Sequence, residues 1–201
     1  MILNSIRSLR WTDFFIYAVT DPRNLYRIIQ NNDPSGFGLS FTIPLVVAVT
    51  EILATSLLGQ QTSFFYYKIT YGWIFNYILL VFFIVITASL MDMMSQFLGF
   101  TGRVKEIITV VNFSIFPKVF LLPLVYIFKS LRFAPGFFYF FFSLGFFIWS
   151  AIIAILAVSE MNRSDNVKSV MVFLFPILLV SITGFFLTII TFFGGITMLF
   201  G

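Results

Sequence analysis

The feature that most constrains this chain is a series of long stretches without a charged residue. Five of them occur, at 34–50, 52–67, 69–91, 133–159 and 169–201, and a sixth, 107–128, is interrupted only by Lys118. A helix that crosses the hydrocarbon core of a bilayer needs about 20 mostly apolar residues. Glu51 alone separates the first two stretches, so they form one span and its exit loop. The pattern predicts five transmembrane helices, at 37–59, 70–95, 107–128, 136–159 and 170–198.

Composition excludes a soluble domain and several kinds of chemistry. Of the 201 residues, 60% are hydrophobic and only 10% are charged, against about 25% charged in a typical globular chain. The chain has no His and no Cys, which removes the usual zinc and haem ligands, thiol nucleophiles and Ser-His-Asp triads. It also lacks a Lys/Arg run of the kind that binds nucleic acid. We therefore expect an integral membrane protein that is not an enzyme, with no cofactor, no metal and no nucleic-acid partner.

Residues 1–35 form an amphipathic segment ahead of the five-helix transmembrane domain, which we place at 36–201. Asp21 is a predicted N-cap and Pro22 the first residue of a helix. In that helix Leu25, Ile28 and Ile29 share one face, and two arginines lie on another. Further upstream, apolar residues repeat at helical spacing at Ile2, Ile6 and Leu9. Two compatible interpretations remain: short helices in the headgroup plane, or a helix packed on the end of the bundle.

The distribution of positive charge predicts the orientation. If the N-terminus is cytoplasmic, the cytoplasmic segments hold eight Lys and Arg residues and the outer segments hold three. The eight are Arg7, Arg10, Arg23, Arg27, Arg103, Lys105, Arg163 and Lys168, and the three are Lys68, Lys129 and Arg132. Because cytoplasmic loops carry the excess of Lys and Arg, this count favours an N-in, C-out topology.

Two ionisable residues lie inside predicted spans, where each is a candidate functional group. Glu51 is about 14 residues into the first helix and Lys118 about 11 into the third, which runs in the same direction. At a rise of 1.5 Å per residue, their depths differ by only about 4 Å. An ion pair is therefore geometrically feasible. It would either fix the packing of the helices or form part of a proton- or ion-coupled site or a slot for a lipid headgroup.

The third span contains the most specific local feature, around Pro117. A proline inside a membrane helix frees a backbone carbonyl that another group must satisfy, and Asn112 and Ser114 are nearby. We expect a kinked helix and a candidate polar site composed of Glu51, Lys118, Asn112, Ser114 and Pro117. Asp92, near the end of the second helix, is a secondary candidate, and we interpret it as a solvated charge at the membrane boundary.

Several motifs together resemble the prokaryotic branch of the Yip1 domain family. They are Asp21-Pro22, the run Gly102-Arg103-Val104-Lys105-Glu106, the run Val111-Asn112-Phe113-Ser114-Ile115-Phe116-Pro117, Trp149 in the fourth span and the turn Asn166-Val167-Lys168-Ser169. The tyrosine common before the serine is Phe113 here, and the signature motifs of the eukaryotic members are not found, so Rab-GTPase binding is not expected. The resemblance implies a compact five-helix domain, with eukaryotic relatives in trafficking, membrane shaping and partner recruitment.

Three functions remain open. The first is a non-enzymatic membrane protein, in a prokaryotic plasma membrane, that organises the bilayer or recruits partners; its partners would be the lipid bilayer and a second copy or another membrane protein. The alternative is a small transporter, channel or lipid-moving protein that uses Glu51 and Lys118. The third is a lipid enzyme with a dyad of Ser114 and Lys118, which share a helix face four residues apart. Pro117 lies between them and argues against this dyad.

Overall fold

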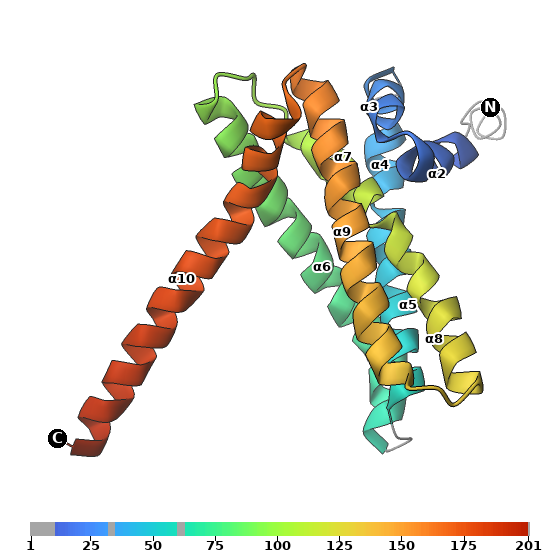
Figure 1. The fold of residues 1–201 in the computed structure, drawn as a ribbon, viewed down its shortest axis with the longest axis vertical. Coiled ribbons are helices and arrows are strands. Elements are labelled where there is room, and N and C mark those ends of the chain that lie inside the picture. Colours follow the sequence, from blue (N-terminus) through green and yellow to red (C-terminus); the bar gives the residue numbers. More distant parts are fainter. Residues whose placement is uncertain (1–10, 32–34, 60–62, 201) are drawn as a thin grey trace.

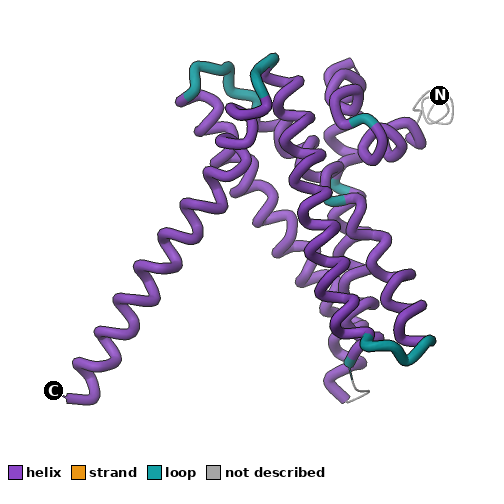
Figure 2. The backbone as a smooth tube through the Cα atoms, viewed as in Figure 1, coloured by secondary structure: helices purple, strands orange, loops and turns teal. Residues whose placement is uncertain are grey.

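The computed structural model describes residues 11–31, 35–59 and 63–200, and every regular element in these ranges is a helix. Five helical segments are long and apolar enough to cross a membrane: Gly36–Leu58, Thr70–Phe97, Val104–Ser130, Pro135–Asn162 and Asn166–Phe186. The predicted all-α fold with five spans is confirmed. Figure 2 shows helix along most of the tube, with the longer loops at the two ends of the bundle.

The amphipathic segment forms α2 (Trp11–Thr20), α3 (Pro22–Asn31) and α4 (Ser35–Ser40). As predicted, α3 begins at Pro22, and the Asp21 carboxylate accepts a hydrogen bond from the backbone N–H of Asn24 at 3.3 Å. Figure 1 shows α2 and α3 beside one end of the bundle. The predicted repeat of Ile2, Ile6 and Leu9 lies outside the described residues.

Helix α3 uses its apolar face to pack on the bundle. Leu25, Tyr26 and Ile29 are buried, and α3 lies against α9 and α7. Arg23 and Arg27 on the other face are exposed. Of the two interpretations of the amphipathic segment, α3 therefore follows the one in which the helix packs on the end of the bundle. Each large apolar side chain that it buries contributes about 1.5–3 kcal/mol. Helix α3 is therefore part of the packed bundle.

The third span is broken in its middle. It consists of α7 (Val104–Ser114), the 3₁₀-helix η1 (Phe116–Phe120) and α8 (Leu121–Ser130). Pro117 lies inside η1, because proline lacks an N–H for the α-helical bond and its ring clashes with the preceding turn. The predicted interruption of this helix is confirmed.

The other spans are continuous helices: α5 (Thr42–Leu58), α6 (Ser63–Phe97), α9 (Pro135–Asn162) and α10 (Asn166–Phe200). The last stretch is one long helix, as predicted. It packs on α6 and α9 and then diverges from the bundle (Figure 1). Between residues 177 and 186 every side chain of α10 is exposed, so this stretch does not pack on the rest of the described chain.

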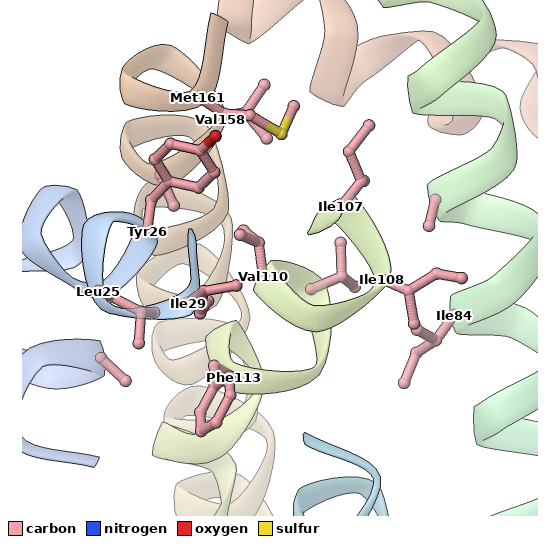
Figure 3. Close-up of a cluster of buried hydrophobic side chains, with 14 of the residues drawn as sticks. Leu25, Tyr26, Ile29, Ile84, Ile107, Ile108, Val110, Phe113, Val158 and Met161 are labelled. Atoms are coloured by element: carbon pink, nitrogen blue, oxygen red, sulfur yellow. The ribbon is translucent and has the colours of Figure 1, made fainter. Parts of the chain in front are cut away.

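The core is centred on α7. Of the apolar stretch of the third span, 56% is buried, against 17–33% for the other four spans. Figure 3 shows Ile107, Val110 and Phe113 of α7 among side chains from α3, α6 and α9. Phe113 also stacks on Phe14 of α2, with ring centroids 5.3 Å apart. The third span is therefore the element around which the others are arranged.

Candidate functional site

Glu51 and Lys118 lie on the walls of one small cavity inside the membrane region. The cavity has a volume of about 60 Å³, and Val47, Leu121, Ser143 and Phe146 also line it. In the described part of the chain, the Lys118 nitrogen does not lie within 4.0 Å of a Glu51 carboxylate oxygen, so the two residues form no ion pair. Instead, a Glu51 oxygen lies 3.4 Å from the amide nitrogen of Asn76, which donates to it. The structure brings the two charges to a shared space without bringing them into direct contact.

Asn112 and Ser114 are not on this cavity but in the core of the bundle. The Asn112 amide nitrogen donates to the Ser40 hydroxyl at 2.9 Å, while its Oδ1, fully buried, has no hydrogen-bond partner among the described residues. The Ser114 hydroxyl donates to the carbonyl of Val111 at 2.8 Å. Since α7 ends at Ser114 and Lys118 belongs to η1, the four-residue spacing does not place them on one α-helical face. The geometry gives no support to a Ser114–Lys118 dyad.

Asp92 differs from our interpretation of it as a solvated charge. It is only 9% exposed. One carboxylate oxygen accepts a hydrogen bond from the backbone N–H of Arg103 at 2.6 Å, and the other accepts one from Gln96 at 2.8 Å. The reason is that the loop after α6 folds back, so that Asp92 meets the first residues of α7, where a negative charge is favourable.

Gly102 permits this close approach of the loop. A Cβ at this position would lie 2.8 Å from the Gln96 amide nitrogen and 3.3 Å from an Asp92 oxygen. Gln96 donates to Asp92, so a larger residue at 102 would require the end of the Gln96 side chain to shift. The Gly-Arg pair before the third span thus has a physical role: the glycine makes room for the carboxylate that receives the arginine's N–H.

A second polar network connects α3 to α7. The Tyr26 hydroxyl donates to Glu106 at 2.8 Å and accepts from the guanidinium of Arg103 at 2.8 Å. Arg103 and Glu106 themselves form an ion pair at 3.7 Å. Burial, together with the carboxylate of Glu106, raises the pKa of Tyr26 to about 12. Tyr26 is therefore a neutral hydroxyl that joins a cation and an anion.

Tyr26 and Arg103 also border a large cavity at the α3 end. This name is used below for the end of the bundle formed by α3, the α6–α7 loop and the last turn of α9. The cavity has a volume of about 760 Å³ and its walls include Arg27, Arg103, Glu160 and Arg163. Arg27 pairs with Glu160 at 2.8 Å and so connects α3 to α9.

From the sequence, these arginines contributed to the predicted orientation, the amphipathic pattern and the family resemblance, and this cavity was not predicted. Two features of the sequence could have indicated the network of Tyr26, Arg103 and Glu106. Arg103 and Glu106 are three residues apart, a spacing that allows an ion pair on a helix, and Tyr26 lies next to Leu25 at the edge of the apolar face of α3.

Comparison with protein families matches residues 16–189 to the Yip1 domain. Searches of curated proteins and of solved structures give no match. The matched region runs from α2 into α10 and includes all five spans, the broken third span and the α3 end. The chain is an integral membrane protein that belongs to the Yip1 domain family.

Proposed function

We propose that this chain is a non-enzymatic protein of the Yip1 type that organises the membrane or recruits partners through its α3 end. The observation that carries the proposal is the built polar surface at this end. The amphipathic helix α3 is docked on the bundle by its apolar face, and it presents Arg23, Arg27 and Gln30 outward. Arg27 bonds to Glu160 of α9 and Tyr26 to Glu106 of α7, so the polar groups of α3 are ordered against both helices.

A surface that is already ordered favours recruitment, because a partner that binds it does not have to order flexible side chains. The opposite end offers a plain contrast: there the loop between α8 and α9 exposes Leu131, Arg132 and Phe133. We place the protein in a prokaryotic plasma membrane, on the basis of the sequence resemblance described above.

Site-specific photo-crosslinking in cells tests the recruitment. A photoreactive residue at Gln30, which is exposed on α3, should give a discrete adduct with a protein partner or with a second copy of the chain. The substitution Arg23→Glu should remove this adduct, and the matched change Arg132→Glu at the opposite end should leave it. Adducts of equal yield from Gln30 and from Leu131, or adducts insensitive to Arg23→Glu, would refute recruitment at the α3 end.

A second candidate function is ion or proton transport, and the shared cavity of Glu51 and Lys118 favours it. Its volume of about 60 Å³ holds about two water molecules at roughly 30 Å³ each, a size that suits a proton or a small ion rather than a lipid. Under this hypothesis Glu51→Gln abolishes flux into liposomes while the purified protein stays folded and monodisperse. Equal flux for wild type and variant would exclude this role of Glu51.

A further inference from the structure

The cavity at the α3 end combines positive charge with hydrogen-bond donors. Its volume, about 760 Å³, lies within the range of roughly 300–1,000 Å³ that is typical of small-molecule sites. Three arginines and one glutamate line it, which gives a formal charge of +2 (three positive, one negative). The Asn162 amide and the Thr101 hydroxyl add further polar groups. Such walls suit an anion with several oxygen atoms.

The three arginines are not equally committed. Arg27 pairs with Glu160, and Arg103 donates to Tyr26 and Thr101. Arg163 takes part in none of the ion pairs found within residues 11–31, 35–59 and 63–200. Its guanidinium is therefore the group with charge to offer to a ligand. Arg163 and Glu160 also line a second cavity of about 370 Å³.

The backbone at Arg163 adopts a conformation that favours glycine. Arg163 caps the C-terminus of α9 with φ 46° and ψ 42°, in the left-handed region. Glycine adopts this conformation at no cost and is the usual residue at such a helix end, whereas a residue with a Cβ is strained by about 1–2 kcal/mol. At this position the chain carries a cation instead of glycine.

The location also fits a phosphate at the surface of a bilayer. The spans that border the cavity end or begin beside it: α6 at Phe97, α7 at Val104 and α9 at Asn162. The cavity therefore lies at the depth of lipid headgroups. Basic pockets between membrane helices at this depth are suited to the headgroups of anionic lipids, and arginine is the residue that binds phosphate in a bidentate manner.

We infer that the cavity at the α3 end binds a phosphate-bearing anion, with Arg163 as its principal ligand and Arg27 and Arg103 beside it. The phosphate belongs to the headgroup of an anionic phospholipid or to a free phosphate, two sources with the same chemistry. This inference is independent of the proposed function, because it holds whether or not the α3 end recruits a protein.

The test uses the full chain, purified in a neutral detergent, with native mass spectrometry and thermal unfolding as readouts. The probes are phosphatidylglycerol, phosphatidylcholine with the same acyl chains, and inorganic phosphate. We expect saturable binding of phosphatidylglycerol and little of phosphatidylcholine, because the positive cavity selects net negative charge. If inorganic phosphate displaces phosphatidylglycerol, the cavity recognises the phosphate group from either source. If it does not, the cavity recognises the headgroup of a membrane lipid. Equal binding of the two lipids would overturn the inference.

The chain offers a matched control for the key residue. Arg132 is also a left-handed, exposed arginine, with φ 52°, but it lies at the opposite end of the bundle. Asparagine tolerates this conformation, so Arg163→Asn and Arg132→Asn change charge with the same mild effect on the backbone. Loss of a hydrogen bond between charged groups corresponds to a factor of about 10–100 in affinity. We expect Arg163→Asn to weaken phosphatidylglycerol binding by about tenfold or more and Arg132→Asn to leave it unchanged.

Glu160→Gln provides a change in the other direction. It removes the negative charge from the cavity and releases Arg27, so binding of the anion should become several-fold tighter. The pair that it breaks involves an Arg27 side chain that is 62% exposed, and such pairs contribute only about 0–1 kcal/mol to stability. Weaker anion binding by Glu160→Gln, or equal losses for Arg163→Asn and Arg132→Asn, would refute the assignment.

Discussion

Tyr26 makes the stability of this protein depend on pH in the alkaline range. The side chain is 4% exposed, donates to Glu106 and accepts from Arg103. Burial is the main reason why its pKa rises from 10.0 to about 12 in the folded chain. Because the folded pKa is the higher one, the neutral phenol stabilises the fold fully below pH 10. This contribution is lost as the pH rises from about 10 to about 12.

The size of the effect follows from the shift in pKa. One pKa unit corresponds to about 1.36 kcal/mol, so the shift from 10.0 to about 12 represents about 3 kcal/mol of stability at most. At neutral pH the substitution Tyr26→Phe removes a hydroxyl that bonds to two charged groups. Glu106 and Arg103 stay 3.7 Å apart and partly exposed to water, which reduces the loss to about 1–2 kcal/mol.

Thermal unfolding of wild type and Tyr26→Phe in the same detergent, from pH 8 to pH 12, measures both effects. Other titrating groups are common to the two proteins, so the difference between the curves isolates Tyr26. We expect Tyr26→Phe to be less stable at pH 8. The two proteins should reach equal stability near about pH 11, and wild type should be the less stable one at pH 12, because its loss of up to about 3 kcal/mol then exceeds the loss of about 1–2 kcal/mol in the variant. Absorbance of tyrosinate should show one tyrosine fewer titrating near pH 12 in the variant. Curves that stay parallel over this range would refute the argument.

Three further predictions concern buried polar groups, each measured by thermal unfolding in detergent. Asn112→Leu should be neutral or slightly stabilising, because it removes a buried oxygen without a partner at the cost of one membrane hydrogen bond of about 0.6 kcal/mol. Ser40→Ala, in contrast, should destabilise the protein by about 1 kcal/mol. A large loss of stability for Asn112→Leu would contradict this prediction. Asp92→Ala should lower the stability by about 1–3 kcal/mol. Asp92→Asn should lower it by less, because asparagine can still accept the hydrogen bond from the N–H of Arg103. Equal losses of stability for the two variants would show that this hydrogen bond is unimportant. Glu51→Gln and Lys118→Met should each be neutral or stabilising, because each removes a poorly solvated charge. The coupling energy in their double-mutant cycle should be below about 1 kcal/mol. A coupling energy above about 2 kcal/mol would mean that the two charges pair.

The number and order of the spans were predictable because length and apolar composition alone determine which segments cross a bilayer. The predicted ends differ by a few residues, since helices continue past the apolar stretch; α9, for example, extends to Asn162. The divergence of α10 was not predictable. Its residues are apolar on all sides, so periodicity cannot distinguish a face toward lipid from a face toward another helix.

Of the candidate site, only the proximity of Glu51 and Lys118 was predictable, because it follows from their depth in the membrane. Equal depth placed Glu51 near Lys118, and both line one cavity. Asp92 was misinterpreted because its partner is a backbone N–H, which leaves no trace in a pattern of side chains. The cavity at the α3 end was missed because Arg27, Arg103 and Arg163 come from three separate segments, which only the tertiary packing of α3, α7 and α9 brings together.

The burial of the third span has a consequence for how the protein enters its membrane during synthesis. This span has the lowest hydropathy of the five and the largest buried share, and it carries Lys118, a residue type that opposes insertion by about 3 kcal/mol at the centre of a helix. Taken alone, it is the segment least readily transferred from the translocon to lipid. However, η1 and α8 pack on α5, and α7 packs on α6, and both of these helices precede the third span in the chain. The first two spans therefore provide the surface on which the third inserts, so that for this helix insertion and assembly are a single step.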